Sequence, residues 1–529
     1  MKILWKILTD TETKQGEGYF AVGSNCLKTD LAEGIVKDLT AEIDLKVEND
    51  EKIFMNGYQT WTDCPEYSPF DKQRGLNHLP KFGVNRFSLD RYGDYHFVKY
   101  PYKKGLFHGF SYCYFRKGDT YRLFASLNEE NGYTIFRYDT NRQKLTLHKD
   151  NEEQKVRGST ELFRFYYAEG SEKEVFDGWF EALNIKPITD KKLCGYSSWY
   201  NRYQNIDEVS LRKDLEGCKE IFEKGDLFQI DDGWEPFVGD WLTTDEKKFP
   251  NGLKQLVDDI HDSGFQAGLW LAPFVAEEKS EVYQKHQDWF LNVNGDNWKC
   301  GCNWSGFYSL DIDNPEVVSY LRETFHKVFD EWGFDLVKLD FLYGAATFGN
   351  EKETRAGRMY RAMRFLRELC GDKAILGCGV PVMPAFGLVE YCRISCDVSL
   401  DWNDVPYMRI IHRERTSTRN AIHNIISRRQ LNRRAYLSDP DVFFLRSENT
   451  KLTTEQKDDL VVLDALFGDV FLTSDDPGNY TPEMKRKYHD FRKLLGAKNA
   501  EITTNNGVKV SYEMNGDTVE KELFKGSKL

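Results

Sequence analysis

Two charged residues near the middle of the chain have the spacing of a reactive pair. Lys338 and Asp340 lie two residues apart in the apolar run Asp335-Leu-Val-Lys-Leu-Asp-Phe-Leu. If this run is a strand, both side chains point to the same face, because side chains alternate along a strand. A lysine ammonium stabilises a nearby ionised carboxylate, so Asp340 is predicted to be an anion able to attack an electrophilic carbon. The alternative is a structural ion pair at a sheet edge.

A second carboxylate follows a similar run, Tyr391-Cys-Arg-Ile-Ser-Cys-Asp, in which Arg393 and Asp397 would share a face. Two carboxylates on different strands of one sheet are what glycoside hydrolysis requires. One attacks the anomeric carbon, and the other protonates the leaving oxygen and then deprotonates water. Arg393 would lower the pKa of Asp397, whereas burial and the other carboxylates would raise it. The sequence leaves the sign of that shift open.

A third run, Phe228-Gln-Ile-Asp-Asp-Gly-Trp, ends in the paired carboxylates Asp231 and Asp232. Ionised carboxylates accept strong hydrogen bonds from sugar hydroxyls and would select their orientation. One of the two could instead cap a helix or hold a loop. A magnesium site of an enolase-like barrel is a further alternative, with which the ammonium of Lys338 would compete.

These runs belong to a regular series of apolar segments that alternate with helical ones from residue 194 onward. Such alternation predicts a parallel sheet, and eight strands close a (β/α)8 TIM barrel whose active site lies at the carboxyl ends of the strands. Polar or aromatic residues follow nearly all of them. The eight candidate strands are Cys194–Trp199, Leu227–Asp231, Gln266–Leu271, Leu336–Phe341, Ala374–Gly379, Tyr391–Cys396, Ala435–Asp439 and Val470–Ser474.

The segments before and after this series have a different pattern of apolar and polar residues. Residues 1–185 contain short alternating runs separated by Gly, Asn and Asp, which predicts an N-terminal antiparallel β-sandwich domain. The catalytic barrel is expected at 186–497, and a small C-terminal antiparallel β-sheet domain at 498–529. Within the first domain, Asn56–Trp61 is either a hairpin with core aromatics or a loop that offers Trp61 to a neighbouring pocket.

The composition limits the partners and the location. A net charge of −13 argues against nucleic acid or an anionic membrane as partner, and no run approaches the length of a membrane span. Eleven cysteines, an odd number, fit the reducing cytoplasm better than a disulfide framework. Seven of the twelve tryptophans fall between Trp199 and Trp304, where indole faces could stack on sugars. No metal spacing and no Gly-x-Gly-x-x-Gly motif after a strand is found, so neither metal nor cofactor is predicted.

Taken together, the motifs resemble those of the α-galactosidases (melibiases) of glycoside hydrolase family 36, closest to the short bacterial branch. The resemblance rests on Phe228-Gln-Ile-Asp-Asp-Gly-Trp, Gly239-Asp-Trp-Leu, Gly268-Leu-Trp-Leu-Ala-Pro-Phe, Val337-Lys-Leu-Asp-Phe-Leu, Leu376-Gly-Cys-Gly-Val-Pro, Arg393-Ile-Ser-Cys-Asp and Leu437-Ser-Asp-Pro-Asp, in that order. The chain departs from the family in lacking the glycine-rich motif of its long members, in carrying Asp63 where many relatives have a nearby serine, and in its short C-terminal sheet.

The resemblance implies a retaining, double-displacement hydrolase of terminal α-galactosyl residues from small sugars of the melibiose or raffinose type. It matches Asp340 to the nucleophile and Asp397 to the acid/base. It places Asp231 and Asp232 at galactose O4 and O6, Lys338 near O3 and O4, and Arg393 with Cys378 near O2. The pocket would be walled by Trp199, Tyr200, Trp270 and Trp61.

The sequence is also compatible with other functions. An α-N-acetylgalactosaminidase on the same scaffold would need room at O2, which Cys378 and Arg393 are expected to fill. An α-galactosyl transglycosylase would need an acceptor pocket that the sequence does not reveal. A sugar-binding protein without catalysis is disfavoured because both Asp340 and Asp397 are retained. A homo-oligomer is also left open.

Overall fold

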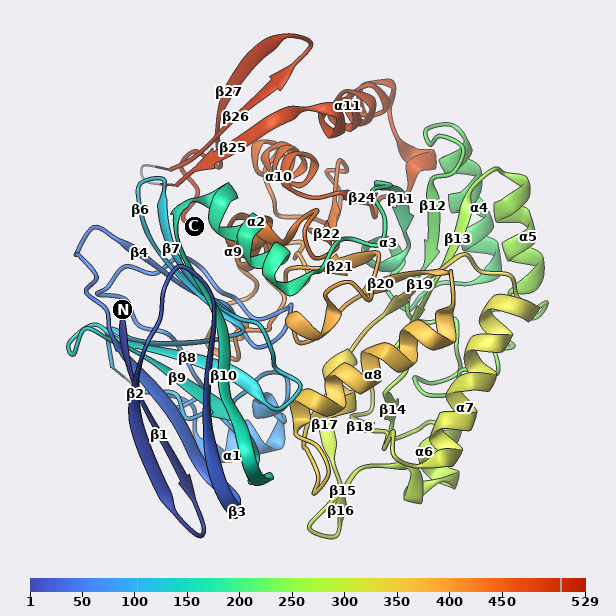
Figure 1. Cartoon of the computed structure of the whole chain (residues 1–529). Coiled ribbons are helices and arrows are strands. Elements are labelled where there is room, and N and C mark those ends of the chain that lie inside the picture. The colour runs from blue at the N-terminus through green and yellow to red at the C-terminus, as the bar shows by residue number, and fades with distance from the viewer. Residues whose placement is uncertain (102, 505–506) are drawn as a thin grey trace.

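The computed structural model describes residues 1–101, 103–504 and 507–529, and it begins with an antiparallel sheet (Figure 1). Its main strand order is β4-β6-β7-β10-β3-β9-β8-β5, and β1 pairs with β2 and β3. The long strands β3 and β10 are neighbours. Phe124 and Phe136 belong to an apolar core inside this domain, whereas Phe54 belongs to the cluster that continues into the parallel domain. The strands are β1 (Lys2–Thr9), β2 (Thr13–Tyr19), β3 (Gly23–Asp44), β4 (Lys52–Met55), β5 (Leu106–Phe110), β6 (Tyr112–Lys117), β7 (Thr120–Ser126), β8 (Tyr133–Asp139), β9 (Lys144–Asp150) and β10 (Lys155–Ser171).

A long connection between β4 and β5 leaves this sheet and reaches the next one. It contains the short helix α1 (Lys81–Arg86) and, at its start, the segment 56–64. Gln59 forms a β-bridge with Pro381, and the backbone N–H of Thr60 donates to the carbonyl of Val380 at 3.0 Å. The N-terminal domain is thereby joined, through its backbone, to the loop that follows β20.

The central part of the chain is a curled parallel sheet of nine strands in the order β22-β21-β20-β19-β13-β12-β11-β24-β23. The strands are β11 (Leu193–Ser197), β12 (Leu227–Ile230), β13 (Gln266–Leu271), β19 (Leu336–Leu339), β20 (Ala374–Gly377), β21 (Tyr391–Arg393), β22 (Leu437–Asp439), β23 (Val442–Phe443) and β24 (Val470–Thr473). All eight strands predicted from the sequence have a counterpart here. Most end one to three residues earlier than predicted, so the carboxylates after them lie in loops.

The helices lie outside the curled sheet, as Figure 1 shows for α4, α5, α7 and α8. In α4, Asp207 and Ser210 cap the first turn reciprocally, and Leu211, Leu215 and Cys218 form the buried face. The helices from α2 onward are α2 (Glu172–Leu183), α3 (Trp199–Arg202), α4 (Glu208–Lys219), α5 (Lys254–Asp262), α6 (Glu281–Lys285), α7 (Pro315–His326), α8 (Arg355–Cys370), α9 (Thr418–Arg428), α10 (Thr454–Phe467) and α11 (Pro482–Lys493).

The long insertion predicted between the third and fourth parallel strands folds into the helices α6 and α7 and several short strands. The strands are β14 (Val275–Glu277), β15 (Asn292–Val293), β16 (Asp296–Asn297), β17 (Lys299–Gly301) and β18 (Phe307–Ser309). The loop between β17 and β18 carries Trp304, whose ring packs against Phe341 at a centroid distance of 5.0 Å. The insertion therefore covers one side of the sheet's carboxyl edge.

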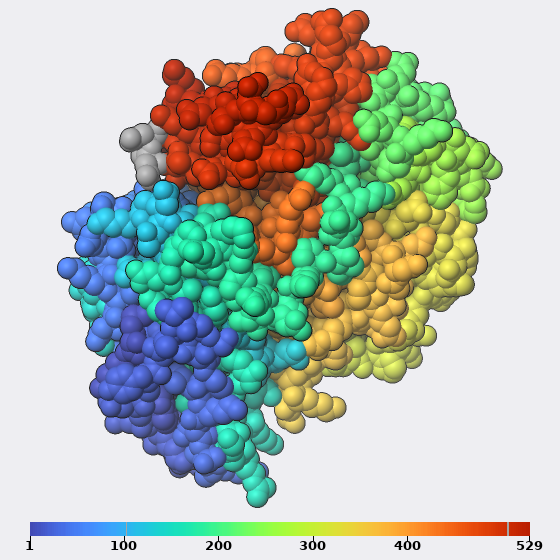
Figure 2. All heavy atoms as spheres, turned by 45° about the horizontal axis from the view of Figure 1, so that its top comes forward, coloured from blue at the N-terminus to red at the C-terminus, as the bar shows by residue number. Residues whose placement is uncertain are grey.

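The chain ends in a small antiparallel sheet of β25 (Lys498–Thr503), β26 (Val508–Met514) and β27 (Asp517–Leu523). Figure 2 shows these strands as a lobe in red beside the rest of the molecule. The backbone N–H of Phe524 donates to Asp459 of α10 at 2.7 Å, which ties the lobe to the parallel domain. None of the described helices combines the length and apolarity that a membrane crossing requires.

Candidate active site

A cavity of about 240 Å³ lies where the parallel strands end. Cavities that hold drug-sized ligands are usually about 300–1,000 Å³, so this one has the scale of a single sugar ring. Eight of the residues predicted for the site line it: Trp61, Trp199, Asp231, Asp232, Trp270, Lys338, Asp340 and Asp397.

Asp340 follows the last residue of β19, and both of its carboxylate oxygens are held. The indole Nε1 of Trp270 donates to Oδ2 at 3.1 Å, and the backbone N–H of Phe341 donates to Oδ1 at 2.9 Å. Phe341 has a φ of +53°, in the left-handed region, where the chain turns sharply out of the sheet. The two donors fix the orientation of the carboxylate, which is 8 % exposed and faces the cavity.

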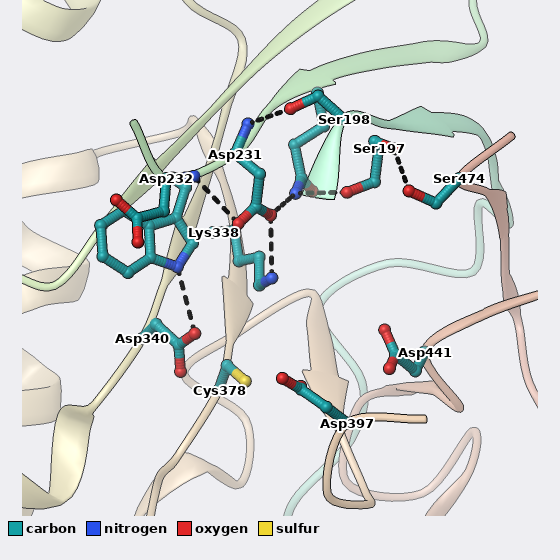
Figure 3. Close-up of polar contacts among 12 residues, drawn as sticks. Ser197, Ser198, Asp231, Asp232, Lys338, Asp340, Cys378, Asp397, Asp441 and Ser474 are labelled. Atoms are coloured by element: carbon teal, nitrogen blue, oxygen red, sulfur yellow. Dashed lines mark hydrogen bonds and ion pairs between the residues drawn. The ribbon is translucent and has the colours of Figure 1, made fainter. Parts of the chain in front are cut away.

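Lys338 forms its ion pair with Asp231 and not with Asp340. Its Nζ lies 2.9 Å from Asp231 Oδ2, and Figure 3 shows Lys338 on the side of Asp231 that faces Asp340 and Asp397. Burial favours the neutral amine, but the charges of Asp231 and Asp340 outweigh it and raise the pKa of Lys338. The lysine is therefore a permanent cation within the cavity wall.

The paired carboxylates after β12 have separate sets of partners. Gln229 donates to Asp231 Oδ2 at 2.7 Å, in addition to the bond from Lys338. Asp232 accepts hydrogen bonds from Gln204 at 3.0 Å and from the indole of Trp304 at 2.8 Å. Trp304 was predicted only as a stacking surface, and its contact with Asp232 could not be predicted because it comes from the distant insertion.

Glu235 is a site residue that the sequence analysis missed. It is 4 % exposed, forms a side-chain hydrogen bond with Asp232, and accepts the backbone N–H of Gly233 at 3.3 Å. Two carboxyl groups in hydrogen-bond contact cannot both be ionised, so one proton lies between them. Burial and the charge of Asp232 raise the pKa of Glu235 well above its usual range, which makes Glu235 the donor.

Asp397 lies four residues beyond the end of β21, in a loop and not in the strand predicted for it. Ile394 N–H still donates to the carbonyl of Asp439 in β22 at 3.1 Å, and further along the carbonyl of Asp397 accepts the N–H of Ser417 at 2.9 Å. Arg393, the last residue of β21, contacts Asp397 at 2.8 Å, Asp439 at 2.9 Å and Asp441 at 2.8 Å. The charge of one guanidinium is therefore shared among three carboxylates.

The sign of the pKa shift at Asp397, open in the sequence, follows from these contacts. The surrounding protein desolvates the carboxyl and raises its pKa, and the charges of Asp340 and Asp231 act in the same direction. Arg393 and Lys338 lower it but do not prevail. The side chain is 37 % exposed, and it borders the cavity. A carboxyl with a raised pKa next to an open cavity can serve as a general acid.

Trp61 reaches the cavity from the N-terminal domain. Its indole Nε1 donates to Cys378 Sγ at 3.2 Å, and its ring meets Phe341 edge-on at 4.9 Å. Gly379 lets it approach, because a Cβ there would lie 2.8 Å from Trp61 Cζ2, and the φ of +57° favours glycine. Of the two predicted alternatives for this segment, the loop that offers Trp61 to a neighbouring domain describes its position.

Arg428, at the end of α9, holds this loop in place. Its side chain is fully buried. It donates to Asn56 Oδ1 at 2.9 Å and to the carbonyls of Gln59 at 3.1 Å, Thr60 and Ile394 at 2.8 Å. The guanidinium thus connects the carboxyl end of β21 with the loop that carries Trp61.

Three of the residues predicted for the pocket lie one layer behind its wall. Tyr200 donates to Asp441 at 2.6 Å, Cys378 accepts from Trp61, and Arg393 pairs with Asp397. They support residues that line the cavity. The rest of the wall includes Tyr92 and several residues from 408 to 416, which have no motif or periodicity that could have identified them. Among the described residues, no group of three or more His, Cys, Asp or Glu side chains could hold a metal ion.

Carboxylates at the ends of parallel strands around a tryptophan-walled cavity are typical of glycoside hydrolases. The comparisons with known proteins agree with this class. Residues 196–369 match the family model described as Melibiase. An α-galactosidase of Escherichia coli is 31 % identical over 152 residues, which is 27 % of this chain and 21 % of that protein.

A solved structure extends the likeness to nearly the whole chain. TtGalA, the α-galactosidase from Thermus thermophilus in complex with p-nitrophenyl α-D-galactopyranoside, has a TM-score of 0.74 and 25 % identity. The match covers 94 % of this chain and 99 % of that one. The α-xylosidase XylQ of Lactiplantibacillus pentosus is 28 % identical over 222 residues, 40 % of this chain and 28 % of XylQ.

These matches agree with the resemblance predicted from the sequence: residues 196–369 are similar to the Melibiase family, and most of the chain is similar in structure to an α-galactosidase. The alignment with the curated α-galactosidase of Escherichia coli spans about a fifth of that protein's length.

Proposed function

We propose that the protein is a retaining α-galactosidase that removes terminal α-galactosyl residues from small oligosaccharides of the melibiose or raffinose type. The observation that carries the proposal is that Asp340 and Asp397 border one tryptophan-walled cavity while the pKa of Asp397 is raised. The first is held as an oriented nucleophile, and the second retains a proton to donate. Figure 3 shows the two side chains on either side of Cys378.

The reaction proceeds in two displacements. Asp340 attacks the anomeric carbon and forms a glycosyl ester while the bond to the leaving oxygen breaks, and that oxygen takes the proton of Asp397. Asp397, now a carboxylate, removes a proton from water, which attacks the same carbon and releases Asp340 and α-galactose. Arg393 stabilises the ionised form of Asp397 in the second half, through the contact at 2.8 Å.

Selection of galactose is assigned to the opposite part of the cavity. Asp231, Asp232 and Lys338 offer carboxylate acceptors and an ammonium donor for O4, O6 and O3. An axial O4 would satisfy such a buried acceptor, and the equatorial O4 of glucose would leave it unpaired. At the O2 corner, Arg393 and Cys378 are both buried, which leaves an acetamido group less room than a hydroxyl and disfavours α-N-acetylgalactosaminidase activity. Transglycosylation on the same scaffold is tested alongside hydrolysis.

We also propose the finer architecture. The strands β22 and β23 lie at opposite ends of the strand order, but only residues 440–441 separate them in the chain. The two ends of the sheet therefore meet, and we take the sheet as a (β/α)8 barrel. The N-terminal sheet is taken as a β-sandwich folded about β3 and β10. Domain limits of 1–185, 186–497 and 498–529 fall between α2 and β11 and just before β25.

A cytoplasmic location is proposed as well. All eleven cysteines are free thiols in the structure, as is usual in a reducing compartment. A homo-oligomer is compatible with the fold and is tested by sedimentation.

The deciding experiment compares p-nitrophenyl α-galactoside with the corresponding α-N-acetylgalactosaminide, α-glucoside, α-xyloside and β-galactoside. Proton NMR identifies the first-formed anomer, and product analysis at high melibiose concentration detects transfer. We expect α-galactoside to be the preferred substrate and α-galactose the first product. Asp340→Ala and Asp397→Ala should each lose several orders of magnitude in turnover.

The matched control is Asp335→Asn, which removes a carboxylate at the opposite end of β19 and should leave turnover near normal. Near-normal activity in Asp340→Ala, or preference for another glycoside, would overturn the assignment.

A further inference from the structure

We propose that Arg415 recognises the leaving group of the substrate by donating a hydrogen bond to an oxygen acceptor on it. The inference deepens the proposed function and rests on it. Arg415 belongs to the connection between β21 and α9, which the motifs of the sequence do not cover.

The position of Arg415 puts it on the leaving-group side of the cavity. It borders the same cavity as the two catalytic carboxylates. Two residues later, the N–H of Ser417 donates to the carbonyl of Asp397 at 2.9 Å, so the segment that carries Arg415 is fastened to the proposed acid. Because the acid must protonate the leaving oxygen, the leaving group lies beside Asp397. The wall next to Asp397 is thus the wall that the leaving group meets.

The guanidinium of Arg415 has more N–H groups than hydrogen-bond acceptors around it. It carries five N–H groups. Nη2 donates to Asn403 Oδ1 at 2.6 Å, and Nη1 donates to the carbonyls of Asn403 at 3.5 Å and Thr416 at 3.3 Å. Throughout residues 1–101, 103–504 and 507–529, no hydrogen bond of its Nε and no carboxylate within 4 Å is found. At least two N–H groups are left for a ligand.

Arg415 also lacks a direct ion pair, in contrast to Arg393 with its three carboxylates; the carboxylates of Asp63 and Asp404 act on it from beyond 4 Å. Arg415 is 8 % exposed, and burial lowers its pKa. A nearly buried cation without an ion pair is costly, and an oxygen-rich ligand at this place would offset that cost.

Arg415 is the one cationic side chain among the cavity-lining residues of this segment, and Thr416 beside it adds a neutral hydroxyl. Tyr92 and His412 stack with a centroid distance of 4.6 Å, and Met408 and Ile411 add apolar surface. The two oxygens of Glu414 already accept from Thr62 at 2.8 Å and from Tyr95 at 2.9 Å. The pocket beside Asp397 thus offers an apolar surface with one cationic donor. A second sugar ring, with apolar faces and hydroxyl oxygens, fits this chemistry, and so does a short leaving group that carries a phosphate.

A purely structural role for Arg415 would be to hold Asn403, and a second arginine provides the control. Arg409, on the exposed side of the same loop, donates through Nε to the carbonyls of Asn403 at 3.0 Å and Asp404 at 2.9 Å. It does not border the cavity. Arg409→Met therefore disturbs the same loop without touching the leaving group.

The experiment measures kcat/KM for phenyl α-galactoside, whose leaving group has no acceptor beyond the glycosidic oxygen, and for melibiose, galactosylglycerol and galactosylglycerol phosphate. The readout is the ratio of each of the last three to the first. Arg415→Met should lower at least one ratio tenfold or more, and Arg409→Met should leave all three unchanged. If Arg415→Met is poorly folded by circular dichroism, Arg415→Lys replaces it and should again lower the ratio, because lysine lacks the planar fork of donors.

The pattern of ratios identifies the acceptor that Arg415 contacts. A fall for melibiose identifies sugar hydroxyls as the acceptors, and a fall confined to the phosphate ester identifies an anion. Ratios that stay unchanged in Arg415→Met, or that fall equally in Arg409→Met, overturn the proposal while α-galactosidase activity stands. A wild-type protein inactive on phenyl α-galactoside instead refutes the proposed function itself.

Discussion

Replacing Glu235 tests whether a shared proton holds Asp232, the carboxylate proposed to bind the sugar. Asp232 has three side-chain partners, of which Gln204 at 3.0 Å and Trp304 at 2.8 Å would remain in Glu235→Ala. The lost bond joins a neutral acid to a charged acceptor, a type worth about 1.5–3 kcal/mol. At 1.4 kcal/mol per factor of ten, kcat/KM for p-nitrophenyl α-galactoside should fall about 10- to 150-fold.

Glu235→Gln tests whether Asp232 requires only a donated hydrogen bond or the carboxyl group of Glu235 itself. The glutamine amide can still donate to Asp232, so kcat/KM should stay within about threefold of wild type. Stability should differ in a pH-dependent way. The raised pKa of Glu235 means that the folded state binds a proton that the unfolded state releases above about pH 4.3. Wild-type stability is therefore lost as pH rises from that value toward the folded-state pKa, and Glu235→Gln does not share the loss.

Thermal melting at pH 5 and pH 8, with kinetics on the same samples, checks both parts. The melting temperature of Glu235→Gln should exceed that of wild type by more at pH 8 than at pH 5. Equal kinetic damage from Gln and Ala would refute the role of the donated proton. A difference in melting temperature that does not change with pH would refute the raised pKa.

Three further predictions follow from the site. The raised pKa of Asp397 implies that kcat/KM falls on the alkaline side as the acid loses its proton, with a midpoint above the usual value of about 3.9; a pH profile that only rises would contradict this role. Arg428→Met removes the donor of two buried oxygens, Asn56 Oδ1 and the carbonyl of Ile394, whereas the carbonyls of Gln59 and Thr60 keep Thr62 N–H at 3.0 Å and Asn424 at 3.4 Å. Denaturant titration should therefore report a loss of about 2–6 kcal/mol, at about 1–3 kcal/mol for each orphaned oxygen, and a loss below about 1 kcal/mol would show that the loop does not depend on Arg428. Gly379→Ala forces a left-handed backbone and a contact with Trp61, so it should cost about 1–3 kcal/mol and raise KM for p-nitrophenyl α-galactoside; unchanged melting and unchanged KM together would contradict the described packing.

The sequence was informative where local pattern determines structure. The alternation of apolar runs and helical segments predicted the parallel sheet, and the position of carboxylates after β12 and β19 predicted residues that border one cavity. The pairing of Lys338 could not be predicted. Its spacing suggested Asp340, but the partner is Asp231 on a different strand, since a long side chain reaches whichever carboxylate the curl of the sheet brings near.

Contacts between segments far apart in the chain could not be predicted from the sequence. Trp304 meets Asp232 across 72 residues of chain, and the wall formed by Tyr92 and His412 joins two segments that carry no motif. Glu235 had a usable signal, because it follows Asp231 and Asp232 closely enough for three acidic groups to meet at one strand end. What the sequence could not supply is the burial that keeps one of them protonated.

The contact between Arg428 and Asn56 spans 372 residues, and this separation has a consequence for biosynthesis. The ribosome completes the segment with Trp61 first, and at about 5–20 residues per second the arginine that anchors it follows about 20–75 s later. Until then, the loop that carries Trp61 lacks the hydrogen bonds from Arg428 that hold it in place. A nascent chain thus completes the proposed sugar pocket only after Arg428 has been added, and we expect fragments that end before Arg428 to lack the proposed activity even where most of the parallel sheet has formed.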